Sequence, residues 1–232
     1  MNPLLPNLAA GSRNALLLLF VFLTTSLRAG DPDAFVDGWL AAQRSLKTWS
    51  ADFIQTRSLK ALKEPLKTPG RLWFAAPDRF RWELGVPAQT IALRDGNELL
   101  VVYPRLRRVE RYPLSGNGAE AWRGALALLD AGFATNRAAL ESRFQIVSQD
   151  GAGESRGLVL EPRAASARRF MTQVRLEIDP KTHAMLANEM RFADGSALRN
   201  DFTNAVVNPA IPDPLFHFDI PDGFKVVEPA AP

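Results

Sequence analysis

Two residue types that often carry out chemistry, cysteine and histidine, are absent or rare in this chain of 232 residues. There is no cysteine, and neither of the two histidines, His183 and His217, has a second histidine at ligand spacing. Because zinc requires three or four convergent nitrogen, sulfur or oxygen ligands, we predict no metal site. A Gly-x-Ser-x-Gly elbow, a phosphate-binding loop and a dinucleotide fingerprint are also missing. We therefore predict no catalytic residue and no cofactor.

Strand carboxylates are the remaining source of acid–base chemistry. Asp52, Glu83 and Glu110 lie in segments of alternating polarity, where two of them could assemble as the carboxylate pair of a glycosidase does. Carboxylates on strands are more often simply solvated, and this is the interpretation we prefer. The sequence indicates a protein that is not an enzyme.

A cluster of arginines is the strongest charge feature. Arg105, Arg107, Arg108 and Arg111 lie within seven residues. They could keep the edge of a strand solvated and protect it from pairing with other chains. Alternatively, they could dock to an acidic partner or to anionic lipid head groups. Both interpretations remain open, and we take these four arginines as candidates for partner docking.

The first 29 residues resemble a secretory signal peptide. Arg13 provides the positive charge, an apolar run of about 11 residues follows from Ala15, and Ala29 ends a small-residue cleavage site. An uncleaved membrane anchor is the alternative, but a spanning helix needs about 20 apolar residues. We expect cleavage near Ala29, export to the periplasm, and one domain over residues 30–232.

Charge argues against nucleic acid as a partner. The chain has 28 basic and 25 acidic residues, and removal of Arg13 and Arg28 with the signal peptide leaves 26 against 25. Nucleic-acid binding requires a clustered basic face, which a nearly neutral body does not imply. The absence of cysteine also excludes a lipid anchor on an N-terminal cysteine, so we expect a freely diffusing monomer.

Hydrophobic periodicity predicts a mainly β domain of the α+β class. A helix should begin at Asp31 and Pro32, and two more are expected at residues 119–129 and 136–142. About ten or eleven strands joined by short turns favour one antiparallel sheet, which must curl because so long a sheet cannot stay flat. The helices are too few for both faces, so they should cover the concave one. The clearest strands are Trp49–Phe53, Leu72–Ala76, Phe80–Leu84, Glu98–Tyr103, Phe144–Gln149, Gly157–Glu161, Phe170–Asp179, Met185–Phe192 and Ser196–Val207.

Several short motifs, taken in order, resemble the LolA-like carriers of outer-membrane lipoproteins from about Phe35 to Val227. The motifs are Asp52-Phe-Ile-Gln-Thr-Arg57, Gly70-x-Leu-Trp-Phe74, Pro77-x-Arg-Phe-Arg-Trp82, Asp95-Gly-Asn97, Val101-Val-Tyr-Pro104 and Phe216-x-Phe218-x-x-Pro221-x-Gly223. The resemblance implies an unclosed antiparallel β-barrel with a helical lid over its concave face. It also implies carriage of an acylated lipoprotein or lipid from an inner-membrane ABC transporter to an outer-membrane receptor.

On this interpretation, alternate side chains of the early strands and of the lid line an apolar cavity. Ordinary core packing would give the same alternation, so the sequence does not separate a lined cavity from a filled one. The cavity candidates are Phe53, Leu72, Phe74, Phe80, Trp82, Leu84, Leu99 and Val101, with Trp122 and Leu126 from the lid.

One position departs from the family pattern. Ala76 stands where the resemblance implies an arginine that holds the lid closed, and the sequence alone does not transfer that role to Arg79 or Arg81. The sequence therefore leaves open whether the cargo is a lipoprotein, a glycolipid or another acylated molecule. A lipid- or lipoprotein-sensing regulatory module of the same fold is the alternative function.

Overall fold

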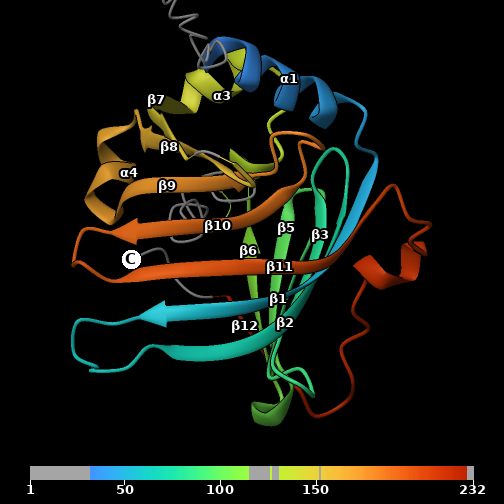
Figure 1. The fold of residues 1–232 in the computed structure, drawn as a ribbon. Helices are drawn as coiled ribbons and strands as arrows, with labels where there is room; N and C mark the ends of the chain where they lie inside the picture. Colours follow the sequence, from blue (N-terminus) through green and yellow to red (C-terminus); the bar gives the residue numbers. More distant parts are fainter. Residues whose placement is uncertain (1–31, 115–125, 127–130, 152, 229–232) are drawn as a thin grey trace, which may run out of the picture. The chain divides into compact units, whose positions relative to one another are not determined.

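Twelve strands form one sheet in the part of the chain that the structure, a computed structural model, describes: residues 32–114, 126, 131–151 and 153–228 (Figure 1). The predicted signal peptide lies outside these residues, and residues 31–232 form one compact unit. The strands are β1 (Thr48–Ser58), β2 (Leu66–Ala75), β3 (Arg79–Leu84), β4 (Thr90–Asp95), β5 (Glu98–Tyr103), β6 (Arg108–Pro113), β7 (Phe144–Asp150), β8 (Arg156–Pro162), β9 (Met171–Ile178), β10 (Met185–Phe192), β11 (Ala197–Val207) and β12 (Lys225–Val227).

The sheet is curled and unclosed, as predicted. Its order is β12-β6-β5-β4-β3-β2-β1-β11-β10-β9-β8-β7, so β1 pairs with β11 and joins the two halves of the chain. It has twelve strands rather than ten or eleven, and the pairing of β12 with β6 is parallel. The other pairings are antiparallel, and all of them except β1 with β11 join strands that are consecutive in the chain.

The described helices confirm two of the three predicted ones. Helix α1 (Pro32–Arg44) begins at the proline, and Asn136 caps α3 (Arg137–Arg143) by accepting a hydrogen bond from the Ala139 N–H. The helix predicted at residues 119–129 lies outside the described residues, except for Leu126. The remaining helical segments are α4 (Ala165–Phe170), η1 (Pro104–Leu106) and η3 (Asp213–Phe216). No helix in the described ranges has the length and apolar character needed to cross a membrane.

The main core lies between the inner face of the sheet and α1. The helix buries the predicted stripe formed by Phe35, Val36, Trp39 and Leu40. These side chains join one buried cluster with the inward-facing residues of the strands. Because a short helix is stable mainly through the apolar face that it packs, this contact fixes α1 over the concave side.

A second, smaller core lies on the outer face of β4, β5 and β6. Phe218, Ile220 and Phe224 from the C-terminal segment cover it, and β12 then adds to the edge of β6. The outward-facing apolar residues beneath this cover are Ile91, Leu93, Leu100, Val102 and Val109. These strands are therefore buried on both faces, which explains why β5 has a nearly continuous apolar sequence.

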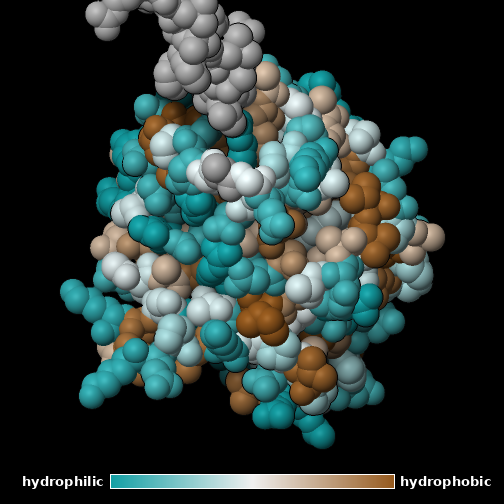
Figure 2. All heavy atoms as spheres, viewed as in Figure 1, coloured by the Kyte–Doolittle hydropathy of each residue, from teal (hydrophilic) through white to brown (hydrophobic). Residues whose placement is uncertain are grey.

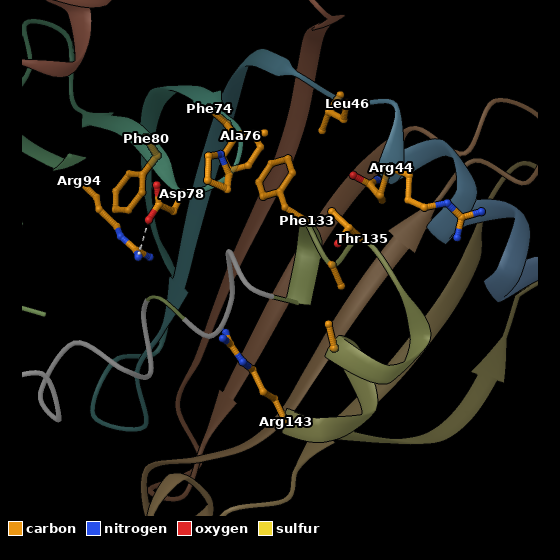
Figure 3. A pocket seen from close by; sticks show the side chains of 14 residues that line it. Arg44, Leu46, Phe74, Ala76, Asp78, Phe80, Arg94, Phe133, Thr135 and Arg143 are labelled. Atoms are coloured by element: carbon orange, nitrogen blue, oxygen red, sulfur yellow. Dashed lines mark hydrogen bonds and ion pairs between the residues drawn. The ribbon is translucent and has the colours of Figure 1, made fainter. Parts of the chain in front are cut away.

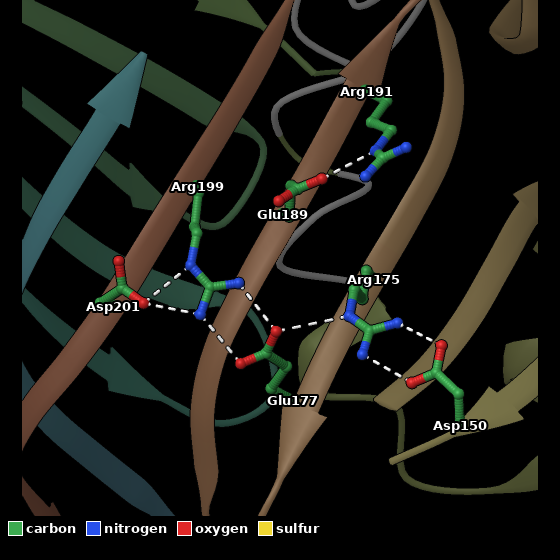
Figure 4. Close-up of polar contacts among 7 residues, drawn as sticks. All are labelled: Asp150, Arg175, Glu177, Glu189, Arg191, Arg199 and Asp201. Carbon is green, nitrogen blue, oxygen red and sulfur yellow. Dashed lines mark hydrogen bonds and ion pairs between the residues drawn. The ribbon is translucent and has the colours of Figure 1, made fainter. Parts of the chain in front are cut away.

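The outer face of β7 to β11 is instead covered by ion pairs. Figure 4 shows the row in which Arg175 binds Asp150 and Glu177, while Arg199 binds Glu177 and Asp201. Gly157 lies between Asp150 and Glu177, and an added Cβ would be 2.3 Å from both Asp150 Oδ1 and Arg175 Nη2. This glycine thus leaves room for the ion pair to cross β8. Figure 2 shows that the surface on this side is mainly hydrophilic, with separate apolar patches.

Candidate functional site

The predicted cavity residues that the structure describes all lie on the inner face of the sheet or pack against it. Six are buried in the main core: Phe53, Leu72, Phe74, Phe80, Leu99 and Val101. Three more pack against that core and are partly buried: Trp82, Leu84 and Leu126. Trp122 lies outside the described residues. The period-two pattern therefore assigns these strand residues to the correct face.

Most of these side chains fill space rather than line an opening. Phe53 is 1% exposed, and its ring centroid is 4.3 Å from that of Trp82 and 6.1 Å from that of Phe202. Of the nine described candidates, Phe74 and Phe80 also line a pocket that reaches the surface. Among the described residues, the middle of the concave face is thus packed, and this pocket lies at one end of it.

The pocket has a volume of about 320 Å³ and lies where β2 turns into β3, beside the end of α1 and near α3 (Figure 3). Its apolar wall is aromatic: the rings of Phe74 and Phe133 stack with centroids 4.0 Å apart and an angle of 8° between their planes. The lining residues are Gln43, Arg44, Leu46, Phe74, Ala76, Pro77, Asp78, Phe80, Arg94, Phe133, Ala134, Thr135, Ala139 and Arg143.

The other wall of the pocket is polar and mostly basic. Arg94 from β4 binds Asp78 through Nη2 at 3.0 Å and donates from Nε to the carbonyl oxygen of Gly96. Arg143 from α3 and Arg44 from α1 add two more positive charges at the rim. Gln43 is 8% exposed, and its Oε1 has no hydrogen-bond partner among the described residues.

Sequence reasoning selected Phe74 and Phe80 as cavity residues and singled out Ala76, but it did not select the other residues of this pocket. Arg94 is inward-facing because Ile91 and Leu93, which would normally be assigned to the core face, turn outward beneath the C-terminal segment. The alternation in β4 contains that signal, but which of its faces is the inner one depends on the C-terminal segment, which comes about 130 residues later in the chain. Phe133 and Gln43 come from the helical layer and give no such signal.

The structure also shows where Ala76, Arg79 and Arg81 lie relative to the pocket. This residue lines the pocket, whereas Arg79 and Arg81 lie on the outer face and hold the C-terminal segment. Arg79 Nη1 is 3.1 Å from Asp213 Oδ1, and Arg81 Nη1 donates to the carbonyl oxygen of Leu215 at 3.2 Å. Neither arginine takes the place of the one that the family pattern has at Ala76.

A row of buried amides crosses the apolar inner face. Gln55 Nε2 donates to Asn200 Oδ1 at 3.2 Å, and Asn200 Nδ2 donates to Asn188 Oδ1 at 2.8 Å. Asn200 is fully buried, and the other two are nearly so. Since buried polar groups must be paired, this row fixes the register of β1, β11 and β10.

Glu110 is buried, contrary to the solvated interpretation of strand carboxylates. It accepts hydrogen bonds from Tyr112 Oη at 2.7 Å and from Tyr103 Oη at 3.4 Å, and it pairs with Arg108. Burial, together with the nearby Glu110 carboxylate, raises the pKa of Tyr103. The other two carboxylates considered, Asp52 and Glu83, pair with Arg71 and Arg81 respectively. The three do not form an acid–base pair.

The four predicted docking arginines fall into two classes. Arg108 pairs with Glu110, and Arg111 pairs with Glu98 across the β5–β6 hairpin. Arg105 and Arg107 lie exposed in the turn between those strands, on either side of Leu106, which is 70% exposed. The turn lies at the end of β5 and β6 opposite to the pocket. The exposed basic feature is therefore a turn and not a strand edge.

The two histidines lie on different elements of the fold. His183 lies in the β9–β10 turn, where its Nε2 would be 2.9 Å from a Cβ added to Gly38 of α1, and His217 follows η3. Within the described ranges, no three histidine or carboxylate side chains are grouped so that they could hold a metal ion.

Comparison with known proteins places the chain in a family. The family model described as outer membrane lipoprotein carrier protein LolA matches residues 44–219. Outer-membrane lipoprotein carrier proteins of Pseudomonas fluorescens and Chromobacterium violaceum are each 26% identical to it, covering 91% and 78% of this chain and 97% and 81% of their own. A LolA superfamily structure from Nitrosomonas europaea aligns with 80% of this chain and 97% of its own, at 11% identity and a TM-score of 0.42. Since the family model matches more than half of the 232 residues, this chain belongs to the LolA family of outer membrane lipoprotein carrier proteins.

Proposed function

We propose that this protein is a periplasmic carrier that shields the acyl chains of a lipoprotein, or of a related acylated lipid, between the inner and the outer membrane. The observation that carries the proposal is a pocket with an aromatic wall that opens at the end of an apolar concave face. Membership of the LolA family and relatives named as lipoprotein carriers support it.

The physical need for such a carrier is large. Each methylene exposed to water costs about 0.8 kcal/mol, so a free chain of ~16 carbons costs on the order of 13 kcal/mol. Unassisted transfer through water would therefore be negligibly slow. A cavity of apolar side chains offsets most of this cost, and an imperfect fit keeps the binding reversible.

In this proposal the pocket receives the first part of the acyl chain. The side chains of the neighbouring core then move apart to admit the rest of it. Phe74 and Phe80 belong to both the pocket wall and the main core, so they connect the open space with the packed one. Side chains deeper in the same face, such as Phe53 and Trp82, would then contact the acyl chain only after the core has opened.

The proposal is tested by purifying the mature protein from a membrane-containing host and analysing its extract by mass spectrometry. We expect co-purified lipid or acylated peptide and uptake of a fluorescent fatty-acyl probe. Phe133→Ser should weaken uptake, because it removes half of the stacked pair in the pocket wall. Phe170→Ser, at an exposed site in α4, is the matched control. Absence of bound lipid together with no probe uptake would refute carriage.

Export is part of the same proposal. The first 29 residues would direct the chain to the periplasm and be removed near Ala29. The mature protein would accept cargo from an inner-membrane ABC transporter and pass it to an outer-membrane receptor. N-terminal sequencing of protein recovered from the periplasm should begin near Gly30, and recovery of the intact chain in the inner membrane would contradict it.

We further propose that the β5–β6 turn is a docking point for an acidic partner. Arg105 and Arg107 are the exposed pair, whereas Arg108 and Arg111 are engaged by carboxylates of the protein itself. Reversal of Arg105 and Arg107 to Glu should slow cargo transfer without lowering thermal stability, since surface charges at the rim of an interface act mainly on association. If the variant transfers cargo at the wild-type rate, the two arginines have no part in docking and are simply solvated.

A further inference from the structure

Two neighbouring turns of the sheet carry exposed apolar side chains. Strands β3 to β6 form consecutive antiparallel pairs, so the β3–β4 turn and the β5–β6 turn emerge at the same end of the sheet (Figure 1). Ile91, just after the first turn, is paired with Val102, just before the second. Val86 in the first turn is 82% exposed, and Leu106 in the second is 70% exposed. Two solvated apolar side chains therefore lie on adjacent turns.

Unpaired positive charge flanks one of these apolar side chains. Arg105 and Arg107 lie on either side of Leu106 in the chain, and both are exposed. Neither guanidinium forms an ion pair with any residue that the structure describes, whereas the next arginine, Arg108, pairs with Glu110. The two arginines of the turn are therefore available to a partner outside the chain.

The C-terminal strand adds a third cation beside the turn. Lys225 is exposed, begins β12 opposite Arg108, and donates its backbone N–H to the carbonyl oxygen of Arg107 at 2.8 Å. Exposed carboxylates occur three residues before it, at Asp222, and three residues after it, at Glu228. Because β12 runs parallel to β6 and away from the turn, Glu228 lies about 10 Å farther along the strand. Positive charge is thus in excess at the turn itself.

The two turns protrude and do not form a flat face. Leu106 is the last residue of η1, and Arg107 follows it in the left-handed region, with φ of 45°, so the β5–β6 connection is tight. A stable protein interface covers about 800 Å² on each partner, which two narrow turns do not offer. An apolar side chain between cations instead matches the boundary of an anionic bilayer, where the apolar group enters the acyl region and the cations stay with the head groups.

We propose that the acidic partner of the β5–β6 turn is the surface of a membrane that contains anionic phospholipid. Leu106 and Val86 enter the boundary between head groups and acyl chains. Arg105, Arg107 and Lys225 lie against the lipid phosphates. The inference rests on the docking role proposed for this turn and names its partner. So few apolar groups and charges give weak and reversible binding, which a shuttle between two membranes requires.

The first test is sedimentation of the protein with vesicles of phosphatidylcholine alone or of an equimolar mixture with phosphatidylglycerol. We expect at least about tenfold stronger binding to the anionic vesicles, falling as salt rises. Arg105→Gln with Arg107→Gln should weaken it about thirtyfold, since each cation near such a surface contributes about fivefold. Lys47→Gln with Lys181→Gln removes two exposed cations at the other end of the sheet, and this matched control should bind as wild type does.

The second test is direct detection of Leu106 in the bilayer. The chain has no cysteine, so Leu106→Cys can carry a single polarity-sensitive fluorophore. Its emission should shift to the blue with anionic vesicles, because the dye leaves water. Val207→Cys is the matched control, since Val207 is 58% exposed at the opposite end of the sheet, and its emission should not shift. Leu106→Ser should weaken vesicle binding about tenfold.

The outcomes separate this inference from the function on which it rests. No binding to anionic vesicles, or binding that loss of both arginines leaves unchanged, would overturn it. If reversal of Arg105 and Arg107 to Glu slows cargo transfer although the wild type binds no vesicles, the acidic partner is a protein and the inference is wrong. The turn and the pocket lie at opposite ends of the strands, so all these variants should retain uptake of the fatty-acyl probe. Vesicle binding without probe uptake by the wild type would refute carriage and leave the membrane contact in place.

Discussion

Replacement of Gly70 by alanine should destabilise the fold far more than its small size suggests. Gly70 lies opposite Phe53 in the β1–β2 pair and opposite Leu84 in the β2–β3 pair. A Cβ at this position would be 2.2 Å from Cζ and 2.5 Å from Cε2 of Phe53, and 2.6 Å from the backbone oxygen of Glu83. Such contacts are far inside van der Waals distance, so either the ring or the strand must move.

The expected cost follows from how little room the ring has. Phe53 is 1% exposed and is packed between Trp82 and Phe202, while the Glu83 oxygen belongs to the sheet backbone. Overpacking of a core costs about 1–3 kcal/mol, and we expect the upper end because neither neighbour is the flexible end of a side chain. For a domain of this size each kcal/mol lowers Tm by about 2–4 °C, so Gly70→Ala should lower Tm by about 6–12 °C.

The measurement is thermal unfolding followed by circular dichroism, with urea unfolding as a second estimate of the free energy. Gly132→Ala is the matched control, because its added Cβ would meet only the flexible end of Met185, at 3.1 Å from Cε. Phe53→Leu should recover part of the loss when combined with Gly70→Ala. A change in Tm below about 2 °C for Gly70→Ala, or one equal to that of the control, would show that the sheet yields at this point and that the reasoning is wrong.

Three further perturbations test other parts of the fold. Hydrogen bonds from Arg199 lower the pKa of Glu177, so their stabilisation is present above the ordinary pKa of a glutamate and is lost as pH falls through the lowered value. Because the pair is partly exposed, Arg199→Gln should reduce the unfolding free energy by at most about 1 kcal/mol at pH 7, and by less at pH 3. An equal reduction at both pH values in urea titrations would contradict this. Asn200→Leu should cost about 2–4 kcal/mol because it leaves two buried amides unpaired, and a neutral effect in urea unfolding would show that water replaces it. Phe218→Ser with Phe224→Ser should uncover the outer face of β4–β6 and increase binding of an apolar dye, whereas unchanged dye binding would mean that the C-terminal segment is held in another way.

Much of the fold follows from local patterns. Pro32 and the apolar stripe of α1, the cap at Asn136 and the period-two runs of the long strands each appear within a few residues of sequence. Two elements do not: α4 has six residues, too few to show a helical period, and β12 has three residues whose partner β6 lies more than 100 positions earlier. Such pairing is decided by tertiary contacts, to which local propensity gives no access.

The candidate site was predictable only in its apolar part. Alternation placed Phe74 and Phe80 on the inner face, but nothing in the sequence separated them from Phe53, which lies in the filled middle. The polar wall was not predictable, because Gln43 and Arg94 meet there from a helix and a strand about 50 residues apart. A site assembled from separate layers depends on how those layers dock, and the residues that line it have no common local pattern.

The two outermost strands of the sheet, β7 and β12, each have a single neighbour among the described strands. In a closed barrel the circumference is set by the number of strands and their stagger, so the bore cannot widen without breaking ladder hydrogen bonds. An unclosed sheet does not have a fixed circumference. A change in its curvature moves its two edge strands apart while every existing strand pairing is kept. A wider cargo would then be accommodated by small rotations between many neighbouring strands. No single pair of strands would have to lose its hydrogen bonds.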